Sequence, residues 1–212
     1  MKGPLFRQRV AWLVCLPVRP FLRRTYGKNH LPAGPCVLAC SHGSILDGPL
    51  IGHAFWPRRM QALVDEEWFI KPLIGTFLRL ADSIVVEVAA PGKTVGIAIE
   101  AARQGSTIVI FPQGGISGNI VTKPKTGAAR IALKAGVPLV PVKLTGSHHI
   151  MLRTGFPKMR RTDIIVGKPI DTRGYDADKP ADWKRLTAEL ARRINELGTG
   201  IGPGLQTGSQ HS

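Results

Sequence analysis

Short apolar runs alternate with longer amphipathic stretches from residue 36 to residue 197. The apolar runs are rich in β-branched residues, which is typical of strands buried on both faces of a parallel sheet. We expect these strands at 36–40, 60–64, 83–88, 107–111, 139–144 and 163–166. We expect helices after a turn at 41–49, then at 66–80 with an interruption at Pro72, and at 92–104, 126–135 and 182–197. This alternation predicts a single α/β domain whose mostly parallel sheet is covered by helices.

The first 27 residues have a different pattern, because they interleave large apolar residues with basic ones and contain no acidic residue. An apolar face in the acyl boundary and basic side chains on lipid phosphates predict an amphipathic helical segment on a membrane surface. The alternative is a helix that packs on the domain with solvated arginines. No apolar run reaches the roughly 18 residues of an ordinary transmembrane helix. We therefore divide the chain into a basic membrane-association segment (1–27), a folded domain (28–198) and a flexible tail (199–212).

Charge and cysteine content narrow the possible partners. Lys and Arg number 29 and Asp and Glu number 14, which gives a formal net charge of +15. This excess predicts a polyanionic partner: nucleic acid, an anionic membrane surface or a phosphorylated substrate. Nucleic acid is least favoured, because no nucleic-acid motif or stacking platform accompanies the charge. Cys15, Cys36 and Cys40 cannot form a disulfide framework and lack a second ligand pair, so we expect reduced thiols and no metal site.

The segment SHGSILD at 41–47 carries the first candidate chemistry. His42 and Asp47 would point about 140° apart within one regular helix. They can meet only if His42 lies in the turn and Asp47 near the start of the helix, where the carboxylate would hold the ring N–H. A histidine held in this way is suited to take a proton from a hydroxyl as a general base. We expect Gly43 to allow close approach of a substrate and Ser44 to cap the helix.

Two further segments follow in the chain. At 110–118 an apolar run enters the turn FPQGG, where glycines free backbone N–H groups for an anion and Lys123 and Lys125 supply charge. At 136–142 the chain reads GVPLVPV, a helix stop followed by a proline-bounded strand. Taken alone, each segment also fits a purely structural role. The first could be a loop histidine beside an unrelated aspartate, the second a glycine-rich turn with solvated lysines, and the third a helix end followed by a strand.

Taken together, the three segments resemble the glycerolipid acyltransferase family, the 1-acylglycerol-3-phosphate and related lysophospholipid acyltransferases. The resemblance rests on H-x4-D after a strand, F-P-x-G about 70 residues later and V-P-x-V-P-V about 25 further on. It covers about residues 28–170, including HLP at 30–32 and GKPI at 167–170. The chain looks closest to the bacterial lysophospholipid acyltransferase domain that is often fused to an acyl-carrier-protein synthetase.

This resemblance implies a peripheral enzyme of phospholipid biosynthesis or remodelling on the cytoplasmic face of a membrane, the inner membrane in a bacterium. It would move a fatty acyl group from acyl-CoA or acyl-carrier protein to the free hydroxyl of a lysophospholipid, with no metal and no bound cofactor. His42 would be the general base and Asp47 its orienting partner, and 137–142 would support the acyl site. We expect substrate contacts from both segments and the nearby lysines: Gly43, Ser44, Phe111, Pro112, Gln113, Gly114, Gly115, Lys123 and Lys125.

The chain departs from the family's pattern at its phosphate-binding positions. The family usually has Phe-Pro-Glu-Gly followed shortly by Arg, whereas here Gln113 and Gly115 occupy those positions. Loss of an arginine–phosphate pair removes a strong charge-assisted contact. Either Lys123 and Lys125 replace the charge, or the acceptor carries no phosphate monoester, as in a lyso-ornithine lipid, or the chain is a catalytically decayed lipid-binding relative.

Overall fold

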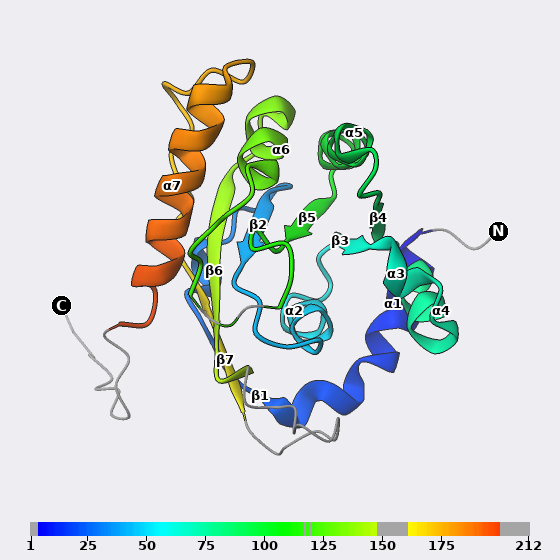
Figure 1. Ribbon diagram of the computed structural model, residues 1–212. Coiled ribbons are helices and arrows are strands. Elements are labelled where there is room, and N and C mark those ends of the chain that lie inside the picture. Colours follow the sequence, from blue (N-terminus) through cyan, green and yellow to red (C-terminus); the bar gives the residue numbers. More distant parts are fainter. Residues whose placement is uncertain (1–3, 117, 119, 148–160, 200–212) are drawn as a thin grey trace.

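The computed structural model describes residues 4–116, 118, 120–147 and 161–199. Its framework is a seven-stranded sheet in the order β1-β7-β6-β2-β5-β3-β4 (Figure 1). The strands are β1 (Leu22–Tyr26), β2 (Val37–Cys40), β3 (Met60–Asp65), β4 (Ile84–Val86), β5 (Thr107–Ile110), β6 (Leu139–Thr145) and β7 (Thr162–Val166). Strands β2 to β6 run parallel to one another, whereas β7 is antiparallel to β6 and parallel to β1. The start of β1 therefore lies at the edge where β2 to β6 end.

Helices cover both faces of the sheet, as the alternation of strands and helices predicts (Figure 1). On one face lie α5 (Pro91–Arg103), α6 (Gly127–Ala135) and α7 (Pro180–Glu196). On the other lie α2 (Asp47–Ala54), α1 (Pro4–Val14) and the 3-10 helix η1 (Leu16–Phe21). Two short helices, α3 (Glu66–Phe69) and α4 (Pro72–Leu80), connect β3 to β4 beside α1, and the 3-10 helix η2 (Lys28–His30) follows β1.

Two apolar cores, one on each face, hold these layers together. Alternate residues of β2 point to opposite faces, as in any strand. Val37 packs in the core beneath α5, α6 and α7, whereas Leu38 packs in the core beneath α2. All four residues of β2 are buried, because the strand is central and covered on both sides. The predicted α/β domain with a mostly parallel sheet is therefore confirmed.

The structure differs from the sequence expectations near the N-terminus. Leu22–Tyr26, within the segment 1–27, forms β1 and pairs with β7, so the sheet begins earlier in the chain than expected. Ala11 of α1 and Cys15, which follows the helix, are buried, whereas Leu13 and Val14 of α1 are more than half exposed. The segment thus packs on the domain and also presents apolar surface. The expected tail lies outside the described residues from residue 200 onward.

Candidate active site

The candidate catalytic residues lie where two neighbouring parallel strands end. Strands β2 and β5 pair side by side, so their carboxyl ends meet at one edge of the sheet, the usual place for ligand sites in such folds. His42 follows β2 and Phe111 follows β5. Their rings stack with centroids 4.1 Å apart and an interplanar angle of 22°. The fold thus brings together the two segments that the sequence singled out.

His42 and Asp47 meet in the geometry that the H-x4-D spacing requires. Helix α2 begins at Asp47, and the Asp47 Oδ2 atom accepts a hydrogen bond from His42 Nδ1 at 3.0 Å. The same oxygen accepts from the backbone N–H groups of Gly43 at 2.7 Å and Ser44 at 2.9 Å. Asp47 is fully buried, while the His42 side chain is 16% exposed. In this hydrogen bond Nδ1–H donates to the carboxylate. The unprotonated nitrogen of the neutral ring is therefore Nε2.

The expected capping role of Ser44 is wrong. The N-cap of α2 is Leu46, and no side chain caps the helix. Ser44 Oγ instead accepts a hydrogen bond from Leu46 N at 3.3 Å, a local turn that competes with capping. The loop is held by the three hydrogen bonds that Asp47 Oδ2 accepts. The sequence did not predict this structural role of Asp47.

Gln113 connects the two segments through backbone groups. Its Oε1 accepts a hydrogen bond from His42 N at 2.7 Å, and its Nε2 donates to Gly118 O at 2.9 Å and Ile120 O at 3.3 Å. In addition, Gly118 N donates to His42 O at 3.1 Å. The chain that follows the FPQGG turn is therefore joined to the His42 loop through both backbone and side chain.

One of the two expected lysines lies against this turn. Lys125 N donates to Pro112 O at 2.7 Å, and its side chain passes over Gly114, where a Cβ atom would lie 2.5 Å from Nζ. Gly114 has a φ of +71°, a left-handed conformation that favours glycine. Pro112 is buried and Gly115 exposed. Lys123 is exposed two residues earlier in the same loop.

The two cysteines of the C-x3-C spacing belong to the core. Both are fully buried: Cys36 lies immediately before the central strand β2, and Cys40 is its last residue. Burial raises the pKa of both thiols, and the negative charge of Asp47 adds to the rise in the pKa of Cys40. Within the described ranges, no group of three His, Cys, Asp or Glu side chains could hold a metal ion.

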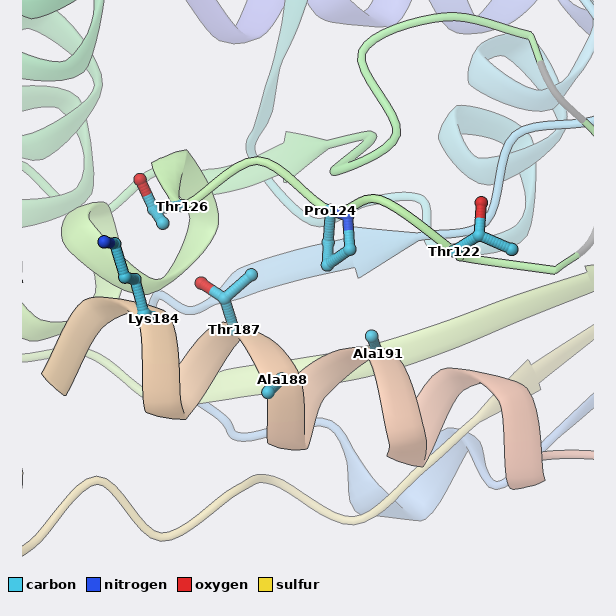
Figure 2. A pocket seen from close by; sticks show the side chains of 7 residues that line it. All are labelled: Thr122, Pro124, Thr126, Lys184, Thr187, Ala188 and Ala191. Carbon is cyan, nitrogen blue, oxygen red and sulfur yellow. The ribbon is translucent and has the colours of Figure 1, made fainter. Parts of the chain in front are cut away.

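A shallow pocket of about 380 Å³ lies elsewhere, between α7 and the loop before α6 (Figure 2). It is lined by Thr122, Pro124, Thr126, Lys184, Thr187, Ala188 and Ala191. None of these residues belongs to the His42 loop or the FPQGG turn. The candidate active site is therefore defined by its hydrogen bonds and ring contacts, and not by this hollow.

A histidine whose ring is held by a buried carboxylate at the carboxyl edge of a mostly parallel sheet can accept a proton from a hydroxyl group. The family model Acyltransferase matches residues 23–145, which is more than half of the chain. The chain belongs to this acyltransferase family, and the prediction from its three ordered motifs is confirmed.

Individual relatives agree with the family. The 1-acyl-sn-glycerol-3-phosphate acyltransferase of Bacillus subtilis is 29% identical over 180 residues, which cover 82% of this chain and 87% of the relative. The enzyme of the same name from Limnanthes alba is 26% identical over 197 residues, covering 89% of this chain and 66% of the plant protein. The crystal structure of the 1-acyl-sn-glycerophosphate (LPA) acyltransferase PlsC from Thermotoga maritima superposes with a TM-score of 0.66 at 21% identity, over 92% of this chain and 78% of that one. That likeness shows the fold.

Proposed function

We propose that this enzyme transfers a fatty acyl group from acyl-CoA or acyl-carrier protein to the free hydroxyl of 1-acylglycerol-3-phosphate or a related lysophospholipid. The acceptor class is supported by the names of the bacterial and plant relatives. The observation that carries the chemistry is the hydrogen bond between His42 Nδ1 and the buried Asp47 carboxylate. It fixes the ring so that one nitrogen is left to act as a base.

In the proposed reaction, His42 Nε2 takes the proton of the acceptor hydroxyl while the oxygen attacks the thioester carbonyl carbon of the donor. The new ester C–O bond forms, the C–S bond breaks, and the proton passes from His42 to the leaving thiolate. Asp47 stabilises the imidazolium that forms in between, because its carboxylate lies 3.0 Å from Nδ1. The step needs no cofactor. Phe111 forms one wall beside the histidine, and Lys125 brings positive charge beside the turn.

Product analysis by mass spectrometry tests this function. The purified chain is incubated with acyl-CoA or acyl-carrier protein and with three acceptors: lysophosphatidate, a lyso-diester phospholipid and a lyso-ornithine lipid. We expect a diacyl product from lysophosphatidate. Product confined to the lyso-ornithine lipid would redirect the acceptor, and no product with any donor would favour a decayed lipid-binding relative.

Two matched histidine variants distinguish loss of the proposed base from loss of the folded structure. In His42→Asn the amide can still donate toward Asp47, but the Nε2 base is gone, so we expect at least a 100-fold loss of kcat. His53→Asn makes the same change in a histidine that stacks on Trp12 with centroids 5.7 Å apart and takes no part in the proposed chemistry. Equal activities of the two variants would refute the role of His42.

We also propose that the catalytic edge of the sheet rests on an anionic membrane surface at the cytoplasmic face. Large apolar side chains are exposed in the segments that join the sheet at this edge. Leu13, Val14 and Leu16 precede β1, Ile70 and Leu73 follow β3, Val88 follows β4, and Ile116 and Ile120 follow β5. Ile70 and Leu73 are 81% and 88% exposed, and Lys71 lies between them in the chain. Apolar side chains beside basic ones suit an interface of acyl chains and phosphates.

This surface would let a lysolipid reach His42 without leaving the bilayer. No helix in the described ranges is long and apolar enough to cross a membrane. Co-sedimentation with phosphatidylglycerol vesicles tests the proposal. We expect Ile70→Glu with Leu73→Glu to weaken binding at least tenfold, whereas Ile97→Glu, on α5 and 45% exposed, leaves binding unchanged. Equal binding by the two variants would exclude this surface.

A further inference from the structure

The Gln113 side chain bridges two backbone segments, the His42 loop and the chain after the FPQGG turn. On one side it accepts from the N–H of His42, and on the other it donates to the carbonyl groups of Gly118 and Ile120. The direction of the amide is unambiguous, because a backbone N–H requires an acceptor and a carbonyl requires a donor. Gln113 is half-buried, as is His42.

We propose that Gln113 is a positioning residue for His42 and not a contact for the acceptor phosphate. This inference rests on the proposed function, since it concerns how the proposed base is held. The amide fixes the backbone of His42 from one side, while Asp47 fixes its ring from the other. Two constraints on one residue hold a base in place more tightly than one, and small displacements in an active site lower the rate steeply.

A carboxylate cannot make the same set of contacts. It offers only acceptors when ionised, so one oxygen would face the carbonyl oxygens of Gly118 and Ile120 without a proton between them. Only a protonated carboxyl group could donate one of the two hydrogen bonds that the amide now donates to these carbonyl oxygens. The family's usual glutamate is therefore not equivalent to Gln113 in this chain. The titratable groups around this bridge are His42, whose backbone N–H it binds, Asp47, which binds the His42 ring, and Lys125, whose side chain lies over the neighbouring Gly114.

Steady-state kinetics of Gln113→Glu between about pH 6 and about pH 9 tests the proposal. We expect kcat to fall about tenfold or more relative to the native enzyme throughout this range, because a glutamate, whose ordinary pKa is about 4.3, is ionised there and would face the two carbonyl oxygens without a proton. The titration of His42 affects both enzymes and largely cancels in the ratio. Gln113→Met, which neither donates nor accepts in this way, should lose kcat similarly at every pH. Gln104→Glu, an exposed position on the other side of the sheet, is the charge control.

The split between kcat and KM separates positioning from substrate contact. A positioning residue lowers kcat and changes the KM for the acceptor by less than about threefold. A rise in the KM for the acceptor with native kcat, or a native kcat in both Gln113→Glu and Gln113→Met, would overturn the proposal.

A second readout works even if the native chain transfers no acyl group. Hydrogen exchange of the Gly118 amide, which donates to His42 O, should quicken at least tenfold in Gln113→Glu and not in Gln104→Glu. Unchanged exchange would overturn the positioning role, whereas faster exchange in an inactive chain would contradict the proposed function alone.

Discussion

Replacing Asp47 by asparagine removes a charge from the candidate site while keeping its shape. The asparagine oxygen can still accept from Gly43 N, Ser44 N and His42 Nδ1, so the loop keeps its hydrogen bonds. What is lost is the attraction between the carboxylate and the imidazolium. At 3.0 Å and an effective dielectric constant of about 20, this attraction is at most about 5–6 kcal/mol. Since 1.36 kcal/mol corresponds to tenfold in rate, we expect kcat to fall by about 10² to 10⁴.

The alanine variant separates charge from structure. Asp47→Ala leaves the N–H groups of Gly43 and Ser44 without their acceptor, at a cost of about 1–3 kcal/mol each. We expect a melting temperature several degrees below that of Asp47→Asn, measured by differential scanning calorimetry. The assay is acyl transfer to lysophosphatidate at saturating donor, with Asp171→Asn, an exposed position, as control. A kcat of Asp47→Asn within about threefold of the native value would refute the orienting role.

Two further predictions concern the cysteines and the FPQGG turn. Burial raises the pKa of Cys15 to about 11 and raises those of the other two thiols, so little thiolate exists near pH 8. Ellman's reagent should therefore react slowly with the native chain and fully with all three thiols in guanidinium; rapid native reaction would contradict the burial. Gly114→Ala should lower the free energy of unfolding by at least about 1–2 kcal/mol, because its φ is +71° and its Cβ would meet a lysine side chain. Gly115→Ala, where nothing lies within 4 Å, should be neutral in the same denaturant titration.

Much of the fold could be predicted because its strands are buried on both faces. The run TIVIF shows β5 almost residue for residue, and Gly136 ends α6 with a φ of +68°, as its place after the helix predicts. Strand β1 escaped prediction, because Arg23 and Arg24 are exposed on an edge strand and give LRRTY the pattern of a basic linker. The reversal of β7 was equally invisible, since strand direction depends on distant pairing and not on local pattern.

The candidate site, like the fold, could be predicted from the sequence only in part. The H-x4-D spacing predicts that His42 and Asp47 can meet only across a turn, and they do. The sequence gives no sign that Asp47 also binds two backbone amides, or that Gln113 faces backbone groups, because such contacts are set by how the loops pack. The one available signal was a glutamine at a position where the resemblance to the family predicts glutamate. This departure drew attention to Gln113 but did not predict the backbone groups that its side chain binds.

The pairing of β1 with β7 has a consequence for the order in which the chain assembles. Leu22 lies opposite Thr162, so the first strand has to wait for a partner that is synthesised about 140 residues later. Strands β2, β5 and β6 pair over shorter separations and can form the centre of the sheet first. During synthesis, β1 would therefore remain an unpaired strand until β7 leaves the ribosome, whereas α1 and η1 can pack earlier on α2 and α4. The edge of the sheet formed by β1 and β7 would then be completed only after its centre has formed.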